Sequence, residues 1–389
     1  MTSSSALRRS WCVIDPAALR HNLLTLRTAM PSPTLMAPVV KSNAYGHGAI
    51  ICSAAFIEAG ADWLCVDSLH EVHDLRQAGF QVPILVLGHL PPHDAADAVA
   101  LGCRAVAYDG AQLEALARAA QARGTVFPIH IKVETGTHRQ GLAAPDALAL
   151  ARAIAQNPSL RLEGISTHFA NVEDTTDHRY AQEQLQRFAA IADALTAQGT
   201  PPEIRSIANS AATLLWPHAH FELTRPGIAC YGMWPSKETL LSAVLVGRQH
   251  LHLRPALTWT TRLAQVKEVP VGAFIGYGCT YQCTHPTRIG VIPVGYYDGY
   301  DRALSNLAHV LVHGQRAPLR GRICMNMAMV DLTDIPQAHA GDEVVLLGPQ
   351  GDASISAETL AEWAGTINYE ITTRIHEGIP RIARQEASP

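Results

Sequence analysis

The sequence predicts an α/β protein: an N-terminal (β/α)8 TIM barrel followed by a C-terminal, mostly β domain. Two observations lead to this prediction. From about residue 34 to 230, short β-branched runs alternate with helical stretches, which is the βαβ pattern of a parallel sheet. After about residue 250 the helical period fades, and short apolar runs separated by turns replace it. We therefore expect a barrel domain over residues 1–250 and a β domain over residues 251–389.

The barrel is predicted from the number of strand-like runs. Roughly eight β/α units within about 200 residues indicate a closed barrel rather than an open doubly wound sheet. The stretches between the runs are rich in Ala, Leu and Gln, which favour helix. The expected strands are Thr34–Lys41, Ala61–Asp67, Val82–Gly88, Cys103–Tyr108, Phe127–Glu134, Arg161–His168, Glu203–Asn209 and Phe221–Gly227. The expected helices include Ala111–Arg123, Ala144–Ala155 and Tyr180–Gln198.

The C-terminal region has the short, turn-separated runs of a β domain. One helix is expected there, near Ser356–Ala364. The expected strands are Leu257–Val269, Arg288–Val294, His309–His313, Ile323–Leu332 and Glu343–Leu347.

Composition and charge exclude several classes of protein. A formal net charge of -4 gives no basic excess for binding nucleic acid. The apolar run Trp11–Ile14 ends at Asp15 and Pro16, so it is too short for a signal peptide. No stretch reaches the roughly 18 apolar residues of a membrane span. We expect a cytoplasmic protein without a nucleic-acid or membrane partner.

The cysteines predict neither a metal site nor a disulfide framework. Eight are scattered along the chain, and none forms a C-x-x-C pair. No second cysteine or histidine pair stands at zinc-finger spacing. We therefore expect reduced structural thiols and no bound metal.

A lysine stands at the end of the first predicted strand, in the segment V-V-K-S-N-A-Y-G-H-G at Val39–Gly48. Active sites of (β/α)8 barrels lie at the C-terminal ends of the strands. An amine that apolar neighbours partly desolvate can lose its proton near neutral pH and condense with an aldehyde as a Schiff base. The alternative is a solvated surface lysine after a buried strand.

This segment closely resembles the pyridoxal phosphate (PLP) attachment segment of bacterial alanine racemases. The resemblance implies that Lys41 carries PLP and that Tyr45 binds its phosphate. Ser42 stands where the family usually has Ala. A second segment, I-K-V-E-T-G-T-H-R-Q-G at Ile131–Gly141, is similar to the family's K-V-D-T-G-M-x-R. It implies that Lys132, a lysine often carbamylated in the family, steadies Arg139.

In the family this arginine binds the substrate carboxylate, and a planar guanidinium suits that task because it meets a carboxylate with two parallel hydrogen bonds. Glu134 and Thr137 replace the family's usual Asp and Met.

Two further segments resemble the family's cofactor contacts. I-A-N-S-A-A at Ile207–Ala212 implies that Ser210, with Asn209 beside it, contacts the PLP phosphate; a helix N-cap is the other interpretation, and both can hold together. T-R-P-G-I-A-C-Y-G at Thr224–Gly232 implies main-chain phosphate contacts from Gly227 and Ile228.

The same segment implies that Arg225 faces the pyridine nitrogen of PLP. A guanidinium only donates hydrogen bonds, so the ring nitrogen is expected to stay unprotonated. This weakens the ring as an electron sink and favours racemisation over transamination. The family commonly has His where Ser206 stands, so the hydrogen bond that this His would give Arg225 is open.

The predicted β domain carries the remaining resemblances. I-G-Y-G-C-T-Y at Ile275–Tyr281 makes Tyr277 the counterpart of the catalytic tyrosine. His168 matches the family histidine that packs near PLP and orients this tyrosine. In the family this tyrosine enters the site of the other subunit, which implies an obligate homodimer with two shared active sites. V-G-Y-Y-D-G-Y implies that Tyr296 lines the way in for the substrate, and G-R-I-C-M-N implies that the Met325 backbone meets its carboxylate. T-I-N-Y-E places Tyr369 near the phosphate.

The motifs follow one another in family order from W-x-x-I-D at Trp11–Asp15 to the C-terminal segment. The chain is thereby identified as a member of the alanine racemase family. The implied activity is a PLP-dependent, two-base interconversion of L- and D-alanine that supplies D-alanine for peptidoglycan. Lys41 would serve the D-enantiomer and Tyr277 the L-enantiomer.

Three other functions were weighed. A PLP decarboxylase on a similar barrel would present an acidic partner to the pyridine nitrogen, which Arg225 opposes. A PLP-binding homeostasis protein would stop after the barrel, which the predicted β domain opposes. A broad-specificity amino-acid or serine racemase would share the same catalytic pair, because substrate choice rests on the volume of the pocket.

Overall fold

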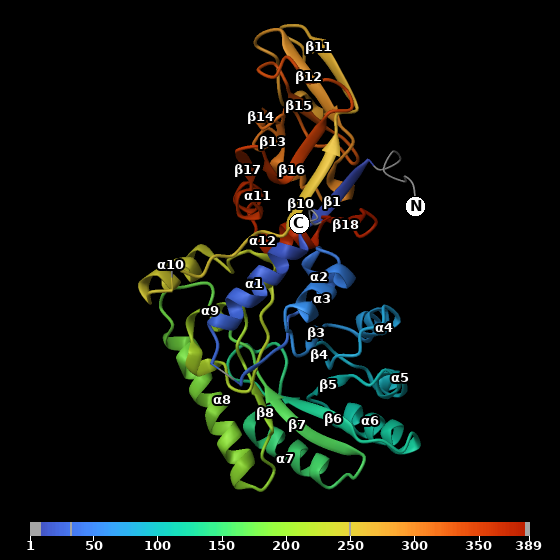
Figure 1. The fold of residues 1–389 in the computed structure, drawn as a ribbon, viewed down its shortest axis with the longest axis vertical. Helices are drawn as coiled ribbons and strands as arrows, with labels where there is room; N and C mark the ends of the chain where they lie inside the picture. The colour runs from blue at the N-terminus through green and yellow to red at the C-terminus, as the bar shows by residue number, and fades with distance from the viewer. Residues whose placement is uncertain (1–8, 32, 249, 386–389) are drawn as a thin grey trace. The chain divides into compact units, whose positions relative to one another are not determined.

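The computed structural model describes residues 9–31, 33–248 and 250–385 (Figure 1). The chain divides into two compact units. The barrel unit comprises Ala18–Ala44 and Cys52–Arg254, and the β unit comprises Met1–Ala17, Tyr45–Ile51 and Pro255–Pro389.

The described strands of the barrel unit are all parallel and follow one another in sequence order. Strands β3 to β8 form one six-stranded sheet, and β2 pairs with β9 (Figure 1). Backbone hydrogen bonds connect these ladders on both sides: for example, the N–H of Val40 donates to the carbonyl of Cys65 at 2.8 Å, and the N–H of Arg225 donates to that of Ala208 at 2.9 Å. The predicted (β/α)8 fold is confirmed. The strands are β2 (Leu35–Met36), β3 (Leu64–Val66), β4 (Ile84–Val86), β5 (Arg104–Ala107), β6 (Phe127–Lys132), β7 (Leu160–Ser166), β8 (Ile204–Ser206) and β9 (Leu223–Thr224).

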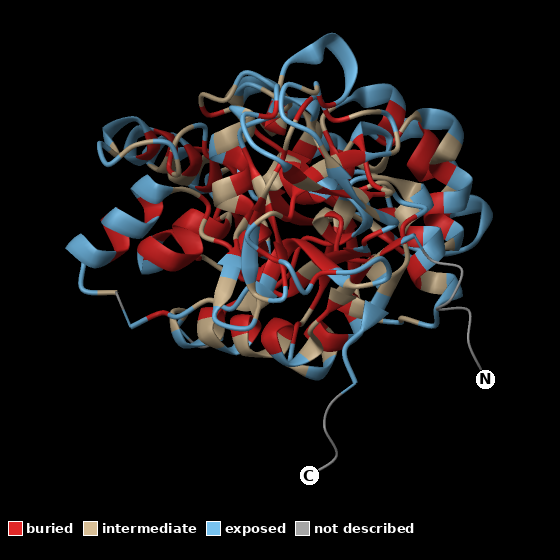
Figure 2. Cartoon of the chain, turned by 90° about the horizontal axis from the view of Figure 1, so that it is seen from above, coloured by how far each residue is buried: buried red, intermediate tan, exposed pale blue. Residues whose placement is uncertain are grey.

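Helices alternate with these strands, and the longer ones bury one face. In α8, the longest, the buried positions include Ala181, Gln184, Phe188 and Leu195, at the three- and four-residue spacing of an amphipathic helix. Buried residues gather on the strands and on the inner sides of the helices (Figure 2). The helices are α1 (Pro16–Thr28), α2 (Lys41–Tyr45), α3 (Ala49–Glu58), α4 (Leu69–Gln77), α5 (Ala95–Ala100), α6 (Gly110–Ala122), α7 (Ala144–Ala155), α8 (Arg179–Ala197), α9 (Ser210–Leu215) and α10 (Lys237–Leu245).

The β unit contains a seven-stranded and a three-stranded sheet among its described residues. The larger sheet has the order β14-β13-β16-β10-β1-β18, with β17 paired to β16, and the smaller has the order β11-β12-β15. Its strands are β1 (Ser10–Ile14), β10 (Leu257–Arg262), β11 (Gln265–Val269), β12 (Thr287–Ile292), β13 (His309–Val312), β14 (Gln315–Pro318), β15 (Ala328–Asp331), β16 (Glu343–Gln350), β17 (Ala353–Ile355) and β18 (Arg381–Ala383), and its helices are α11 (Ala357–Ala364) and α12 (Asn368–Thr373).

The sequence-based elements of this region are largely confirmed, with two differences. The predicted strand Ile323–Leu332 is shorter in the structure, where β15 covers only Ala328–Asp331. The run Leu257–Val269 was predicted as a single strand, whereas it forms β10 and β11, which belong to different sheets. The two strands are separated at Leu263, which is buried, while Ala264 is exposed. None of the described helices is both long enough and apolar enough to cross a membrane.

Candidate functional site

Lys41 begins an unusual turn of the backbone. Ser42, Asn43 and Ala44 have φ values of 53°, 53° and 55°, and Tyr45 continues at 53°. Four consecutive residues other than glycine thus lie in the left-handed region, which L-residues rarely occupy. The N–H of Ala44 donates to the carbonyl of Val40 at 2.9 Å and closes the turn. The ammonium of Lys41 lies 3.4 Å from the carboxylate of Asp67.

A polar row crosses the sheet beside this turn. Lys132, Ser166 and Ser206 are aligned neighbours on β6, β7 and β8, each at the C-terminal end of its strand. Lys132 is buried. Burial and the nearby cations Arg225 and Arg139 hold the pKa of Lys132 well below its usual value. These surroundings therefore favour the uncharged form of the Lys132 amine more than water does.

Arg225 follows β9 and is buried. Its guanidinium donates to the carbonyl of Thr167 at 2.7 Å and to the hydroxyl of Ser206. Ser206 in turn donates to the carbonyl of Leu223 at 2.7 Å. At the position where the family commonly has His, the serine hydroxyl thus accepts a hydrogen bond from the arginine. Burial lowers the pKa of Arg225.

His168 lies just beyond β7, in the same charged surroundings. Burial is the main cause that holds the pKa of His168 well below its usual value; Lys132, when protonated, and Arg225 lower it further, so the ring is neutral at pH 7. Its backbone carbonyl accepts hydrogen bonds from Thr137 Oγ1 at 2.7 Å and Gln184 Nε2 at 3.1 Å. The loop that follows β7 is thereby fixed to the loop that follows β6.

The loop that carries Arg139 is organised by Glu134. The carboxylate of Glu134 accepts the backbone N–H of Gly136 and, at 2.7 Å, that of Thr137. Burial raises the pKa of Glu134, but these amide hydrogen bonds outweigh it and lower the pKa overall. A glutamate in place of the family's aspartate therefore still orders this loop. Arg139 itself is exposed.

The predicted phosphate contacts meet at the start of α9. Ser210 Oγ accepts the N–H of Gly227 at 2.8 Å and that of Ala229 at 3.2 Å. The side chain of Asn209 accepts the N–H of Ala212 at 3.0 Å, which makes it the N-cap of α9. The N-cap interpretation thus holds for Asn209. Ser210 and the main chain at Gly227 and Ile228 lie together, as a shared role requires.

In the β unit, Tyr277 stands on an exposed turn. It lies between Gly276 and Gly278, whose φ values are 70° and 73°. The N–H of Ile275 donates to the carbonyl of Tyr281 at 2.9 Å and closes the hairpin. The side chain of Tyr277 is 72% exposed. Because both flanking residues need the left-handed region, glycine suits each position and the turn presents the phenol to solvent.

Two other predicted residues of the β unit lie on adjoining backbone. The N–H of Tyr296 donates to the carbonyl of Cys324 at 3.1 Å, and the N–H of Tyr297 donates to that of Met325 at 2.9 Å. A side chain at Gly295 would overlap both carbonyls, so the two segments pack this closely only with glycine there. The rings of Tyr45 and Tyr369 also meet, with centroids 6.0 Å apart.

The structure therefore brings the predicted residues together in two groups. Lys41, Lys132, His168 and Arg225 gather at the C-terminal ends of the barrel strands, and the tyrosines and Met325 belong to the β unit. Sequence reasoning missed Asp67 and Glu71, which contact the Lys41 turn. The signal for Glu71 was present, because S-x-x-E directly after a predicted strand is a capping-box pattern.

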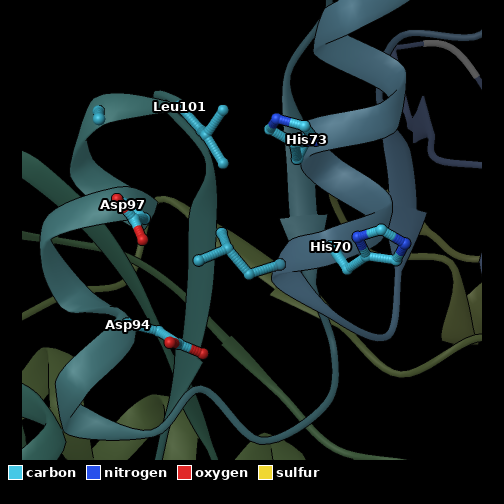
Figure 3. Close-up of a pocket in the computed structure, with 7 residues that line it drawn as sticks. His70, His73, Asp94, Asp97 and Leu101 are labelled. Atoms are coloured by element: carbon cyan, nitrogen blue, oxygen red, sulfur yellow. The ribbon is translucent and has the colours of Figure 1, made fainter.

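A separate pocket of about 550 Å³ lies between α4 and α5 (Figure 3). None of the predicted site residues lines it. On α4, His70 and His73 each lie 3.5 Å from Asp74, and all three are exposed. Helix spacing explains these contacts, so we assign no ion to them. That the protein needs no metal stays a prediction.

Comparison with known proteins decides the family. Residues 14–235 match the family described as "Alanine racemase, N-terminal domain", and residues 256–383 match "Alanine racemase, C-terminal domain". The chain belongs to the alanine racemase family.

Curated relatives and solved structures agree over almost the whole chain. The alanine racemases of Desulfovibrio desulfuricans and Symbiobacterium thermophilum are 40% and 41% identical to it over 96% of the chain, which spans 98% and 97% of their own lengths. The structure from Streptomyces lavendulae has a TM-score of 0.90 at 36% identity, and the coverage is 98% of both chains. The Bacillus anthracis alanine racemase with bound L-Ala-P has a TM-score of 0.89 at 34% identity, covering 97% of this chain and 95% of its own.

The membership fixes the class of reaction. The chain is a PLP-dependent isomerase that interconverts L- and D-alanine, as the resemblance predicted. Because residues 256–383 match the C-terminal family domain, the chain differs from single-domain PLP-binding barrels. The family also implies the predicted role in supplying D-alanine to the cell wall.

Proposed function

We propose that the chain racemises alanine with two bases, in which Lys41 exchanges the α-proton of D-alanine and Tyr277 that of L-alanine. One observation carries the proposal on the barrel side. Lys41 lies beyond the C-terminal end of β2 and begins a left-handed turn, next to a group of basic side chains buried at the strand ends. Active sites of this fold lie at that end of the barrel.

The residues present fit PLP and an amino-acid carboxylate. Arg225, Arg139 and Lys41 all depress the pKa of Lys132, which shows that this end of the barrel carries excess positive charge. Such surroundings suit a phosphate and a carboxylate. Lys41 would hold the cofactor through its amine. The phosphate would be bound by Tyr45, Asn209, Ser210, Gly227, Ile228 and Tyr369.

Arg225 selects the outcome of the reaction. Bound PLP withdraws electrons from the α-carbon so that its proton can leave. Arg225 donates hydrogen bonds to Thr167 and Ser206, and it can only donate to a ring nitrogen as well. It therefore keeps that nitrogen unprotonated, which favours return of the proton to the α-carbon. The neutral His168 ring would orient Tyr277 without adding a further charge.

The other predicted residues bind the substrate. Arg139 and the backbone of Met325 would hold the carboxylate of alanine, and Tyr296 would line its way in. Burial and nearby cations lower the pKa of Lys132 and so favour its neutral amine. A neutral amine reacts with carbon dioxide, so we propose that Lys132 is carbamylated and steadies Arg139 with the resulting anion.

The exposed face of the β unit supports a homodimer. Tyr277 is 72% exposed. Other large apolar side chains near it in the sequence, or on the two segments that meet at Tyr296 and Met325, are also exposed: Phe274, Tyr296, Tyr297, Met325 and Met327. A chain that stays monomeric rarely exposes so many large apolar side chains together. We propose that a second copy covers this face, so that each Tyr277 serves the Lys41 of its partner. The eight unpaired cysteines fit the reducing cytoplasm.

Two measurements test this function. Reduction of the PLP-loaded protein with borohydride should fix the cofactor on the peptide that contains Lys41, and recovery of the label on another lysine would refute the assignment. Racemisation of alanine, serine and lysine should be assayed side by side. We expect alanine to have the highest kcat/KM, whereas equal rates for all three would favour the broad-specificity alternative.

A further inference from the structure

The carboxylate of Glu71 contacts both segments that meet at Lys41. Its Oε1 accepts the backbone N–H of Ser42, the residue after Lys41, at 2.6 Å. Its Oε2 accepts the N–H of Asp67 at 2.7 Å and that of Ser68 at 3.1 Å. Asp67 is also the residue whose side chain pairs with the Lys41 ammonium at 3.4 Å. One carboxylate thus holds the backbone on both sides of the Lys41–Asp67 pair.

The Ser42 side of this contact needs such support. Ser42 opens the left-handed turn, and left-handed residues other than glycine persist only where their surroundings hold them. The side chains of Ser42 and Asn43 are exposed, so burial does not hold the start of the turn. The hydrogen bond to Glu71 is short and charge-assisted, which is the stronger kind.

The Asp67 side is rigid. Glu71 lies in the first turn of α4, where it forms a capping box with Ser68. The N–H of Gly88 donates to the carbonyl of Asp67 at 3.1 Å, and a side chain at Gly88 would overlap that carbonyl. Asp67 is therefore fixed by the strand end behind it. Glu71 is anchored on a rigid loop and extends to a strained turn.

We propose that Glu71 is a positioning residue for the reaction: by fastening the Lys41 turn to the loop between β3 and α4, it sets where the Lys41 amine stands. The inference rests on the proposed function in one respect, that Lys41 carries PLP. A carboxylate is needed, because one oxygen accepts the N–H of Ser42 and the other accepts the N–H of Asp67. A glutamine would turn its NH2 group toward one of the two sets of N–H donors and lose that contact.

The test compares Glu71→Gln with Ser68→Ala. The second variant removes the hydroxyl that caps α4 but leaves every N–H that Glu71 binds. Both are measured as apo-protein, for melting temperature and PLP dissociation constant, and as PLP-loaded protein, for the pH at which the visible absorption band changes and for kcat and KM. We expect Glu71→Gln to weaken PLP binding and to lower kcat by roughly tenfold each, the scale of one lost charge-assisted hydrogen bond.

The KM for alanine should change much less in Glu71→Gln, because the substrate contacts remain. The pH of the spectral change should shift in Glu71→Gln and stay at the wild-type value in Ser68→Ala.

If both variants changed melting temperature, PLP affinity and spectrum alike, Glu71 would be no more than a helix cap and the proposal would be wrong. If Glu71→Gln failed to fold, Glu71→Asp serves instead, since its shorter carboxylate keeps the charge near Asp67 and Ser68 but no longer reaches Ser42. A wild-type protein that does not bind PLP on Lys41 would contradict the proposed function rather than this inference.

Discussion

Among the single residues of the site, Lys132 is the one whose pKa depends most clearly on its surroundings. Burial is the main cause of its lowered pKa, and Arg225 and Arg139 add to it. An exposed lysine has a pKa of about 10.4 and is protonated at pH 7, which protects it from carbon dioxide. A lysine at the strand ends can therefore react with carbon dioxide under conditions in which a lysine at the surface does not.

This state gives the first prediction. With ¹³C-labelled bicarbonate at neutral pH, the protein should show a carbamate carbon signal by NMR. The signal should vanish as the pH falls through the lowered pKa of Lys132, because a protonated amine does not react. It should also be absent in Lys132→Ala, which we expect to raise the KM for alanine roughly tenfold by releasing Arg139.

The matched control is Lys267→Ala, which removes an exposed lysine of β11. It should keep the carbamate signal and the wild-type KM. A signal that persists in Lys132→Ala would show that another amine carries the carbamate.

Among the elements, the segment after the Lys41 turn is restricted by its contact with α12. Gly46 has a φ of 84°, and a side chain there would overlap the carbonyl of Thr372. Tyr369 belongs to the short helix α12, and its ring contacts the ring of Tyr45. The position of the two tyrosines therefore depends on the absence of a side chain at Gly46.

Gly46→Ala should consequently lower the stability of the apo-protein by about 1–3 kcal/mol, the scale of local strain and overpacking, and weaken PLP binding. Thermal unfolding and PLP titration measure the two effects. Gly60→Ala is the control, because Gly60 has a similar φ of 90° but nothing within 4 Å of the added carbon. Equal losses in both variants would mean that only the backbone angle matters and that contact with α12 does not.

The sequence could predict the type of most elements because alternation and helical period are local. It predicted Thr34–Lys41 as one strand, whereas β2 covers only Leu35–Met36. The residues after β2 still form backbone hydrogen bonds to the neighbouring strand, since the N–H of Ala37 donates to the carbonyl of Thr224 at 2.9 Å, but the regular ladder ends at Met36. The number of residues in a hydrogen-bonded strand pair depends on how the sheet closes, and a local sequence pattern carries no information about that closure.

The sequence predicted which residues belong to the site, but not which residues hold them in place. Motif resemblance found Lys41, Arg225 and Tyr277, and whether they act as proposed stays a prediction. The left-handed turn at Ser42 opposes the local preference of its own residues, so it depends on Glu71, which lies 29 residues away in the sequence. This contact joins residues that are distant in the sequence, so it could not be predicted before the fold was known.

For the whole molecule, the shared-site proposal gives the last prediction. Homodimers of Lys41→Ala and of Tyr277→Phe should each be nearly inactive, since a positioned acid or base contributes about 10²–10⁴-fold. Subunit exchange between equal amounts should restore activity. Half of the dimers are then mixed, and one of the two sites in each mixed dimer has both native bases, so about a quarter of all sites should be native.

Racemisation assays after exchange, with mixed dimers quantified by native mass spectrometry, measure this recovery. As a control, exchange of Lys41→Ala with Lys41→Met should form mixed dimers without restoring activity. Mixed dimers of the first pair that stay inactive would show that both bases come from one chain.

The two ends of the described chain are neighbours in one sheet, and this bears on how the protein is made. β1 pairs with β10 and β18, so that Cys12 lies opposite Trp259 and beside Arg381. During synthesis the strands of the barrel unit emerge between β1 and β10, and β18 emerges later still. The larger sheet of the β unit therefore cannot be completed until every strand of the barrel unit is already available. Because strands so distant in sequence pair slowly, we expect the β unit to complete its fold after the barrel unit.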